Sequence, residues 1–156
     1  MSAQTIEILL VEDNPNDLEL ALHAFERHKF TNQIEVARDG QEALDYLFGG
    51  NGRSPGAPPK LVLLDLKLPK VDGLEVLREI RSDPGLRHLP VVILTSSREE
   101  RDIVESYHLG VNSYIVKPVD FDKFVDTVQT LGLYWLLLNE PPVHAAPPAT
   151  KGSYVP

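Results

Sequence analysis

Cysteine is absent from this chain of 156 residues. Its absence excludes disulfide bonds, thiolate metal sites and cysteine nucleophiles. The chain begins with Met-Ser-Ala-Gln and so lacks the basic and apolar regions of a secretory signal peptide. From these two features we expect a cytoplasmic protein.

Long apolar runs and positive charge are also scarce. The longest apolar candidate, residues 131–138, contains Gly132 and falls well below the roughly 18 residues that cross a bilayer, so we expect no membrane span. Lys and Arg total 15 against 23 Asp and Glu, which gives a formal net charge of −8. Because such a surface repels phosphate backbones, we expect no direct contact with nucleic acid.

The residues that are present suit one globular domain. Hydrophobic residues make up 42% of the chain and charged residues 24%, and the length fits a single core. Five short runs are typical of β-strands, and three of them (6–11, 61–64 and 91–94) have the apolar character of strands buried on both faces. The two mixed runs, 34–37 and 113–116, predict strands near the sheet edges.

Helical spacing follows each strand. Asn14 has the character of a helix cap, Pro15 takes the first helical position, and Leu18, Ala21 and Phe25 recur on one stripe. The other stretches with helical spacing are 41–48, 74–81, 99–109 and 121 to about 138. Five alternating strand–helix units predict an α/β fold, a doubly wound five-stranded parallel sheet with helices on both faces.

Three segments have a distinct composition. Residues 49–60 are rich in Gly and Pro and predict an exposed loop. The charged run at 98–102 predicts the exposed start of a helix. Residues 139–156 include five prolines and predict an extended, Pro-rich tail. We therefore expect one folded domain at 1–138, followed by a tail at 139–156.

Polar side chains stand where the predicted strands end. Glu12 and Asp13 follow the first strand and Asp65 the third, while Thr95 and Lys117 follow the fourth and fifth. The carboxyl ends of parallel strands meet at one crevice, so these groups converge. Carboxylates 4 Å apart repel by about 4 kcal/mol per pair at an effective dielectric near 20, which a cation must offset. Oxygen ligands suit Mg²⁺, and the sequence therefore predicts a magnesium site.

The same residues suit phosphoryl transfer. The Asp65 carboxylate can attack phosphorus in line and form an acyl phosphate. Mg²⁺ would then take one phosphoryl oxygen, Lys117 a second, and the Thr95 hydroxyl with nearby backbone amides a third. Taken alone, Glu12 and Asp13 also fit acids placed to suit a helix dipole, and Lys117 and Thr95 fit an exposed lysine and a capping hydroxyl. The case for a site rests on the combination.

Four motifs resemble the receiver domain of two-component response regulators, over about residues 5–131. They are Ile-Leu-Leu-Val-Glu-Asp-Asn at 8–14, Leu-Leu-Asp-Leu-Lys-Leu-Pro at 63–69 with Asp-Gly at 72–73, Leu-Thr-Ser at 94–96, and Tyr-Ile-Val-Lys-Pro at 114–118. The resemblance implies a flavodoxin-like (βα)5 receiver fold with strand order 2-1-3-4-5. It also implies that Asp65 accepts a phosphoryl group from the phosphohistidine of a sensor histidine kinase and loses it by slow hydrolysis, without acting as a turnover enzyme.

The resemblance assigns further roles. It implies that Asp13, Asp65 and the backbone carbonyl of Lys67 bind Mg²⁺, with Glu12 reaching the ion directly or through water. Thr95 and Tyr114 match the family's switch pair, in which the hydroxyl moves toward the phosphate and the ring follows inward. A partly exposed edge-strand aromatic is the plainer interpretation of Tyr114. The peptide bond from Lys117 to Pro118 matches one that is usually cis in the family.

A narrower resemblance concerns partners. The loop at 49–60, the Pro-Asn-Asp segment at 15–17 and the apolar ending at 131–138 resemble the stand-alone regulators encoded with bacterial and cyanobacterial phytochromes. This implies a phytochrome as the partner kinase. We expect a receiver domain without an attached output domain. The signal would then pass to another protein, or the phosphoryl group to a histidine phosphotransfer protein.

The last predicted helix carries more apolar side chains than one packed face can bury. Leu133, Tyr134 and 136–138 lie outside the stripe that faces the sheet, and apolar patches of this kind mark interfaces. We expect a homodimer through the helix at 99–109, the strand at 113–116 and the helix at 121–138. The alternative is a tail that folds back over these side chains in the monomer.

Two other functions remain as alternatives. One is a dehalogenase-like aspartyl-phosphate phosphatase, which also uses an Asp nucleophile and Mg²⁺ but requires a second acid where this chain has Lys67. The other is an interaction module that keeps the fold without being phosphorylated.

Overall fold

Five parallel strands form one sheet in the order β2-β1-β3-β4-β5. The computed structural model describes residues 8–27, 33–50, 52, 54–55, 58–120 and 122–124. The strands are β1 (Ile8–Val11), β2 (Ile34–Ala37), β3 (Leu61–Leu64), β4 (Val91–Thr95) and β5 (Ser113–Val116). The predicted α/β class and the strand order 2-1-3-4-5 are confirmed. Strand β4 runs one residue beyond its predicted end, because Thr95 still pairs with Val116.

The central strands are the most apolar. Every residue of β1, β3 and β4 is buried, whereas β2 and β5 at the edges are mostly half-buried. This difference follows the sequence, since a strand covered on both faces must be apolar at every position and an edge strand need not be. The prediction of two edge strands is confirmed.

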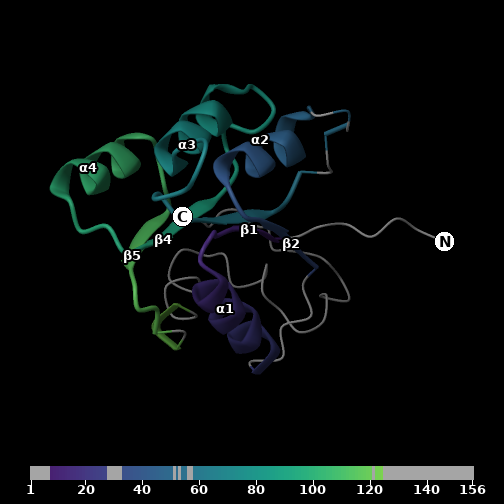
Figure 1. Cartoon of the computed structure of the whole chain (residues 1–156). Helices are drawn as coiled ribbons and strands as arrows, with labels where there is room; N and C mark the ends of the chain where they lie inside the picture. Colours follow the sequence, from purple (N-terminus) through teal and green to yellow (C-terminus); the bar gives the residue numbers. More distant parts are fainter. Residues whose placement is uncertain are drawn as a thin grey trace, which may run out of the picture.

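Four helices are described: α1 (Pro15–Arg27), α2 (Gly40–Phe48), α3 (Gly73–Ser82) and α4 (Glu100–His108). Helices α2, α3 and α4 cover one face of the sheet and α1 lies on the other (Figure 1). Helix α2 begins one residue before its predicted start because Asp39 caps it, accepting a hydrogen bond from the Glu42 amide at 2.8 Å. Helix α4 is shorter than predicted by one residue at each end.

Alternate residues of each strand point into two cores. One core joins α2 and α3 to the sheet through residues such as Leu9, Leu64 and Leu77. The other packs α1 against the opposite face through Leu18, Ala21 and Phe25, which confirms the predicted stripe. Burying a large aliphatic side chain contributes about 1.5–3 kcal/mol, so these contacts hold the helices against the sheet.

The structure describes the remaining predicted segments only in part. In the loop 49–60 the described residues form no helix and are mostly exposed, although Pro59 is buried. The fifth helix is described only at 122–124, and most of 121–138 and the whole tail at 139–156 lie outside the described residues. Among the described helices, none has the length and apolar character needed to cross a membrane.

Candidate functional site

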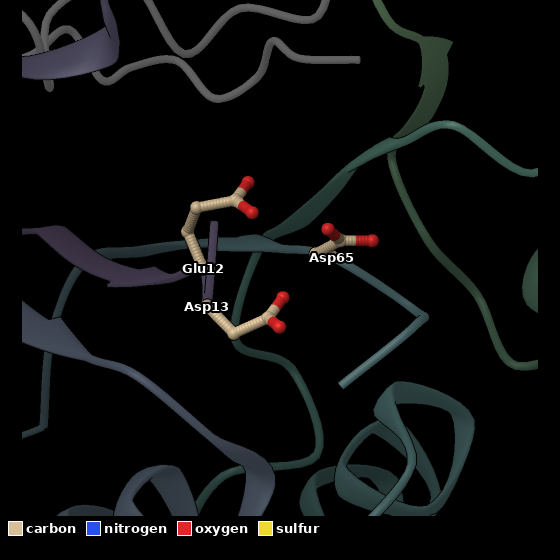
Figure 2. A group of neighbouring side chains, drawn as sticks. All are labelled: Glu12, Asp13 and Asp65. Atoms are coloured by element: carbon tan, nitrogen blue, oxygen red, sulfur yellow. The ribbon is translucent and has the colours of Figure 1, made fainter. Parts of the chain in front are cut away.

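The register of the sheet brings three carboxylates together. Val11 at the end of β1 pairs with Leu64 at the end of β3, and the next amide along, that of Asp65, donates to the Val11 carbonyl at 3.1 Å. One carboxylate oxygen from each of Glu12, Asp13 and Asp65 lies within 4.8 Å of the others. Figure 2 shows the three side chains at the ends of β1 and β3. Their predicted convergence is confirmed.

Lys117 closes this group from β5. Its ammonium nitrogen lies 2.7 Å from Glu12 Oε1, 2.7 Å from Asp17 Oδ2 and 3.0 Å from Asp65 Oδ2. Burial alone would lower the pKa of Lys117, but hydrogen bonds to the three carboxylates outweigh it and raise the pKa above its usual value. The lysine therefore stays charged. The peptide bond that follows it, to Pro118, is cis, as the family resemblance implied.

Glu12 shows that one ammonium does not neutralise the cluster. Burial raises the pKa of Glu12 to about 7, and the charge of Asp65 adds to this effect. Hydrogen bonds from Lys117 and from the Asn14 amide act in the opposite direction but do not cancel it. Near neutral pH the carboxylate therefore needs further positive charge to remain fully ionised.

A divalent cation fits the donor set. Glu12, Asp13 and Asp65 offer only oxygen atoms, the ligands preferred by hard cations such as Mg²⁺ and Mn²⁺. Glu12 and Asp65 are 4% and 5% exposed while Asp13 is exposed, so the group opens on one side. Lys67 also borders the site, since its amide donates to Asp65 Oδ1 at 3.1 Å. The metal-binding role of its carbonyl stays a prediction.

The two predicted switch residues meet at Ser97. Thr95 is fully buried at the end of β4, and its hydroxyl accepts a hydrogen bond from the Ser97 amide at 3.3 Å. The Tyr114 hydroxyl donates to the Ser97 carbonyl at 3.0 Å, and burial raises the pKa of Tyr114. The loop between β4 and α4 therefore connects both side chains. Whether they move as a pair stays a prediction.

Asp102 departs from the sequence analysis. The charged run 98–102 was expected to be exposed, but Asp102 is 5% exposed. Its Oδ2 accepts a hydrogen bond from the Ser97 hydroxyl at 2.6 Å and lies 3.3 Å from Lys67 Nζ. The Ser97 bond and the Lys67 charge lower the pKa of Asp102. The expectation was wrong for this residue because a helix start that packs against two loops buries one side.

Asp17 is a site residue that the sequence analysis missed. Asp17 entered only through the family resemblance of the segment 15–17, yet it lies against Lys117. The available signal was its place in the first turn of a helix that starts at the end of β1, the same sheet edge as the predicted site.

Comparison with known proteins places this site in a family. Residues 8–129 match the family model described as the response regulator receiver domain. The chain is 50% identical to the probable methanogenesis regulatory protein FilR2 of Methanothrix harundinacea, over 86% of each chain. It is 39% identical to response regulator Rcp1 of Synechocystis, over 83% of this chain and 88% of that one.

Solved structures show the same fold. The bacteriophytochrome response regulator AtBRR is 58% identical with a TM-score of 0.75, over 88% of this chain and 100% of that one. The Mn²⁺-bound form of Rcp1 is 38% identical with a TM-score of 0.70, over 88% and 99%. The phosphorylated cyanobacterial phytochrome response regulator RcpA is 41% identical with a TM-score of 0.67, over 85% and 94%.

Proposed function

The chain belongs to the response regulator receiver family, and from that premise we propose that Asp65 accepts a phosphoryl group from the phosphohistidine of a sensor kinase. One observation carries the proposal. Asp65 is a buried carboxylate at the end of a central strand, with one oxygen bound to the Lys117 ammonium and the other to the Lys67 amide. A carboxylate held in this way, beside further acids, is a positioned nucleophile.

The surrounding residues divide the work of transfer. An Asp65 oxygen attacks phosphorus while the bond from phosphorus to the histidine nitrogen breaks. The Lys117 ammonium nitrogen already lies 3.0 Å from Asp65 Oδ2, within reach of an oxygen of a phosphoryl group bound to Asp65. Thr95 supplies a hydroxyl from the neighbouring strand end. The bound acyl phosphate is then lost by slow hydrolysis, which makes the protein a signal carrier rather than a turnover enzyme.

Magnesium is the proposed metal. Asp13, Asp65 and the Lys67 carbonyl would hold the ion, with Glu12 beside it. When bound, the ion supplies positive charge that neutralises the phosphoryl oxygens. The name of the Rcp1 structure specifies Mn²⁺, and the oxygen ligands here suit either ion.

The proposed partner is a phytochrome-type histidine kinase in the cytoplasm. AtBRR and RcpA are both named as phytochrome regulators, and the identity to AtBRR is 58%. Phosphorylation of Asp65 would change the face formed by α4 and β5, through Thr95 and Tyr114. That face would pass the signal to another protein, or the phosphoryl group would move on to a histidine phosphotransfer protein.

A homodimer is proposed through α4, β5 and residues 121–138. On α4, Val104 and Tyr107 are 59% and 52% exposed, and their spacing puts them on one side of the helix. Size-exclusion chromatography with light scattering tests this on the chain and on a version cut after residue 139, which also tests the division into domain and tail. Two dimers support the proposal, whereas two monomers contradict it.

Intact-mass spectrometry tests the phosphoryl acceptor. We expect the chain to gain one phosphoryl group when incubated with Mg²⁺ and acetyl phosphate, and we expect Asp65→Asn to gain none. The control is Asp72→Asn, which removes an exposed acid near the same loop and should react like the parent chain. No modification of the parent favours the interaction module. Sustained release of phosphate from many phosphomonoesters favours the phosphatase.

A further inference from the structure

Asp17 contacts the proposed catalytic lysine but has no part in the function described so far. Its Oδ2 lies 2.7 Å from Lys117 Nζ, as close as Glu12 and closer than Asp65. The two residues are 100 positions apart in the chain. The contact therefore reflects the way α1 docks beside the end of β5, and it calls for a role.

The start of α1 holds Asp17 in place. Asn14 caps the helix, and its side-chain oxygen accepts hydrogen bonds from the amides of Asn16 at 2.9 Å and Asp17 at 3.0 Å. The amide of Asn14 itself donates to Glu12 Oε2 at 3.1 Å. One cap thus fixes both Glu12 and Asp17, which approach Lys117 from neighbouring points of the chain.

The three partners of Lys117 differ in what else they do. An ammonium group has three N–H donors, and Glu12, Asp17 and Asp65 can accept one each. Glu12 and Asp65 also belong to the carboxylate cluster that suits a metal ion. Asp17 stands outside that cluster. It is therefore the partner that stays with Lys117 when the other two are engaged elsewhere.

Resting on the phosphoryl-acceptor function above, we propose that Asp17 is a positioning residue, which anchors the Lys117 ammonium so that a free N–H is directed at the phosphoryl group on Asp65. In this arrangement a phosphoryl oxygen replaces Asp65 Oδ2 as the third acceptor. Asp17 and the Asn14 cap keep the nitrogen where it already lies, 3.0 Å from the nucleophile.

A positioning role and a simple charge effect predict opposite changes in the phosphorylation rate when Asp17 is removed. An acid beside the site repels an anionic phosphodonor, so its removal should speed the reaction if charge alone matters. If Asp17 positions Lys117, its removal leaves the ammonium free to move, and the reaction should slow. A misplacement of about 1 Å can cost about 100-fold in rate, so a smaller displacement of the Lys117 ammonium should cost about tenfold.

The test compares Asp17→Ala with a charge-matched control, Glu19→Ala, at an exposed site on the same helix. Phosphorylation by acetyl phosphate in Mg²⁺ is followed by intact mass over a range of donor concentrations. We expect Asp17→Ala to lower the saturating rate about tenfold with little change in the half-saturating concentration. Asp17→Glu should restore most of the rate, and Glu19→Ala should match the parent chain. A rate for Asp17→Ala equal to or above that of Glu19→Ala overturns the proposal.

A second measurement needs no phosphodonor. Lysine ammonium protons give observable ¹⁵N–¹H NMR signals when hydrogen bonds protect them from exchange with water. With Mg²⁺ added, which would engage Glu12 and Asp65, we expect the Lys117 signal in the parent and in Asp17→Glu, and its loss in Asp17→Ala. A signal that persists in Asp17→Ala contradicts the anchoring role. If the parent chain accepts no phosphoryl group, the acceptor function fails, while the ammonium signal still judges the anchor.

Discussion

Lys117 and Arg81 are two partly buried cations at opposite ends of the parallel strands, and their hydrogen-bond partners are chemically different. Lys117 follows β5 and faces three carboxylates. Arg81, at the end of α3, faces backbone carbonyls that precede β4 and β5. These are the carbonyls of Leu109 at 2.7 Å, Leu89 at 2.8 Å, Gly110 at 2.8 Å and Arg87 at 3.2 Å.

The difference separates a reactive edge of the sheet, where the strands end, from a structural edge, where β4 and β5 begin. A carboxylate can exchange its hydrogen bond with the ammonium for coordination to a metal ion or, at Asp65, for a covalent bond to phosphorus, so Glu12 and Asp65 are replaceable partners of Lys117. The carbonyls around Arg81 lie outside the carboxylate cluster, and the planar guanidinium of Arg81 links two loops to the end of a helix. Burial lowers the pKa of Arg81, and its hydrogen bonds offset that cost. Removing each cation should therefore damage a different property.

Arg81→Met should produce the largest loss of stability. Two of its carbonyl partners lie in partly buried hydrogen bonds, and leaving such groups unpaired costs about 1–3 kcal/mol each, so we expect a total near 3 kcal/mol. Urea unfolding measures this. Arg78→Met on the same helix removes only exposed ion pairs with Glu75 and Glu105 and should cost less than about 1 kcal/mol. Equal losses of unfolding free energy in the two variants would show that the hydrogen bonds of Arg81 to the carbonyls do not stabilise the fold.

Lys117→Met should damage phosphorylation instead. Losing the ammonium removes a donor aimed at the transferred group, for which a rate loss of about 100-fold is expected, equivalent to about 2.7 kcal/mol. The rate with acetyl phosphate measures this, with Lys123→Met at an exposed position as control. Arg81→Met should stay within about twofold of the parent rate, because it lies at the other edge. A comparable rate loss in Arg81→Met would break the division between the two edges.

Sequence reasoning could locate the reactive edge because strand ends are local features. Glu12, Asp65 and Lys117 each follow an apolar run, and parallel pairing brings such ends together whatever the helices do. Asp17 and Asp102 were missed for the opposite reason. Both lie in first turns of helices, and the docking of those helices against distant residues decides which way their side chains face.

Arg81 shows the same limit at the structural edge. Its place in the last turn of α3 could be predicted from helical spacing, but its partners are carbonyls of residues up to 29 positions away. Backbone carbonyls carry no sequence signature, so no pattern indicates which of them a side chain will reach. The sequence could therefore predict which residues converge on a site through strand pairing, and it could not predict contacts that depend on loop geometry.

Ser97→Ala should give the smallest effect and should refine the comparison, because Asp102 combines a replaceable charge with a structural role. The Ser97 hydroxyl is the main cause of the lowered pKa of Asp102. A carboxyl with a lowered folded-state pKa contributes stability above its unfolded pKa, near 3.9, and that stability is lost as the pH falls through the folded-state pKa. Ser97→Ala should therefore cost about 1 kcal/mol near neutral pH.

Acidification should shrink that cost, because protonation of Asp102 removes the charge that the hydroxyl stabilises. Urea unfolding between about pH 7 and about pH 2.5, a range that passes below the unfolded pKa near 3.9, measures the trend, with Ser96→Ala at the exposed neighbouring position as control. A cost that stays constant over this range would mean that the stabilisation by Ser97 of the β4–α4 loop does not depend on the charge of Asp102. Asp102 would then resemble the carbonyls around Arg81 more than the carboxylates around Lys117.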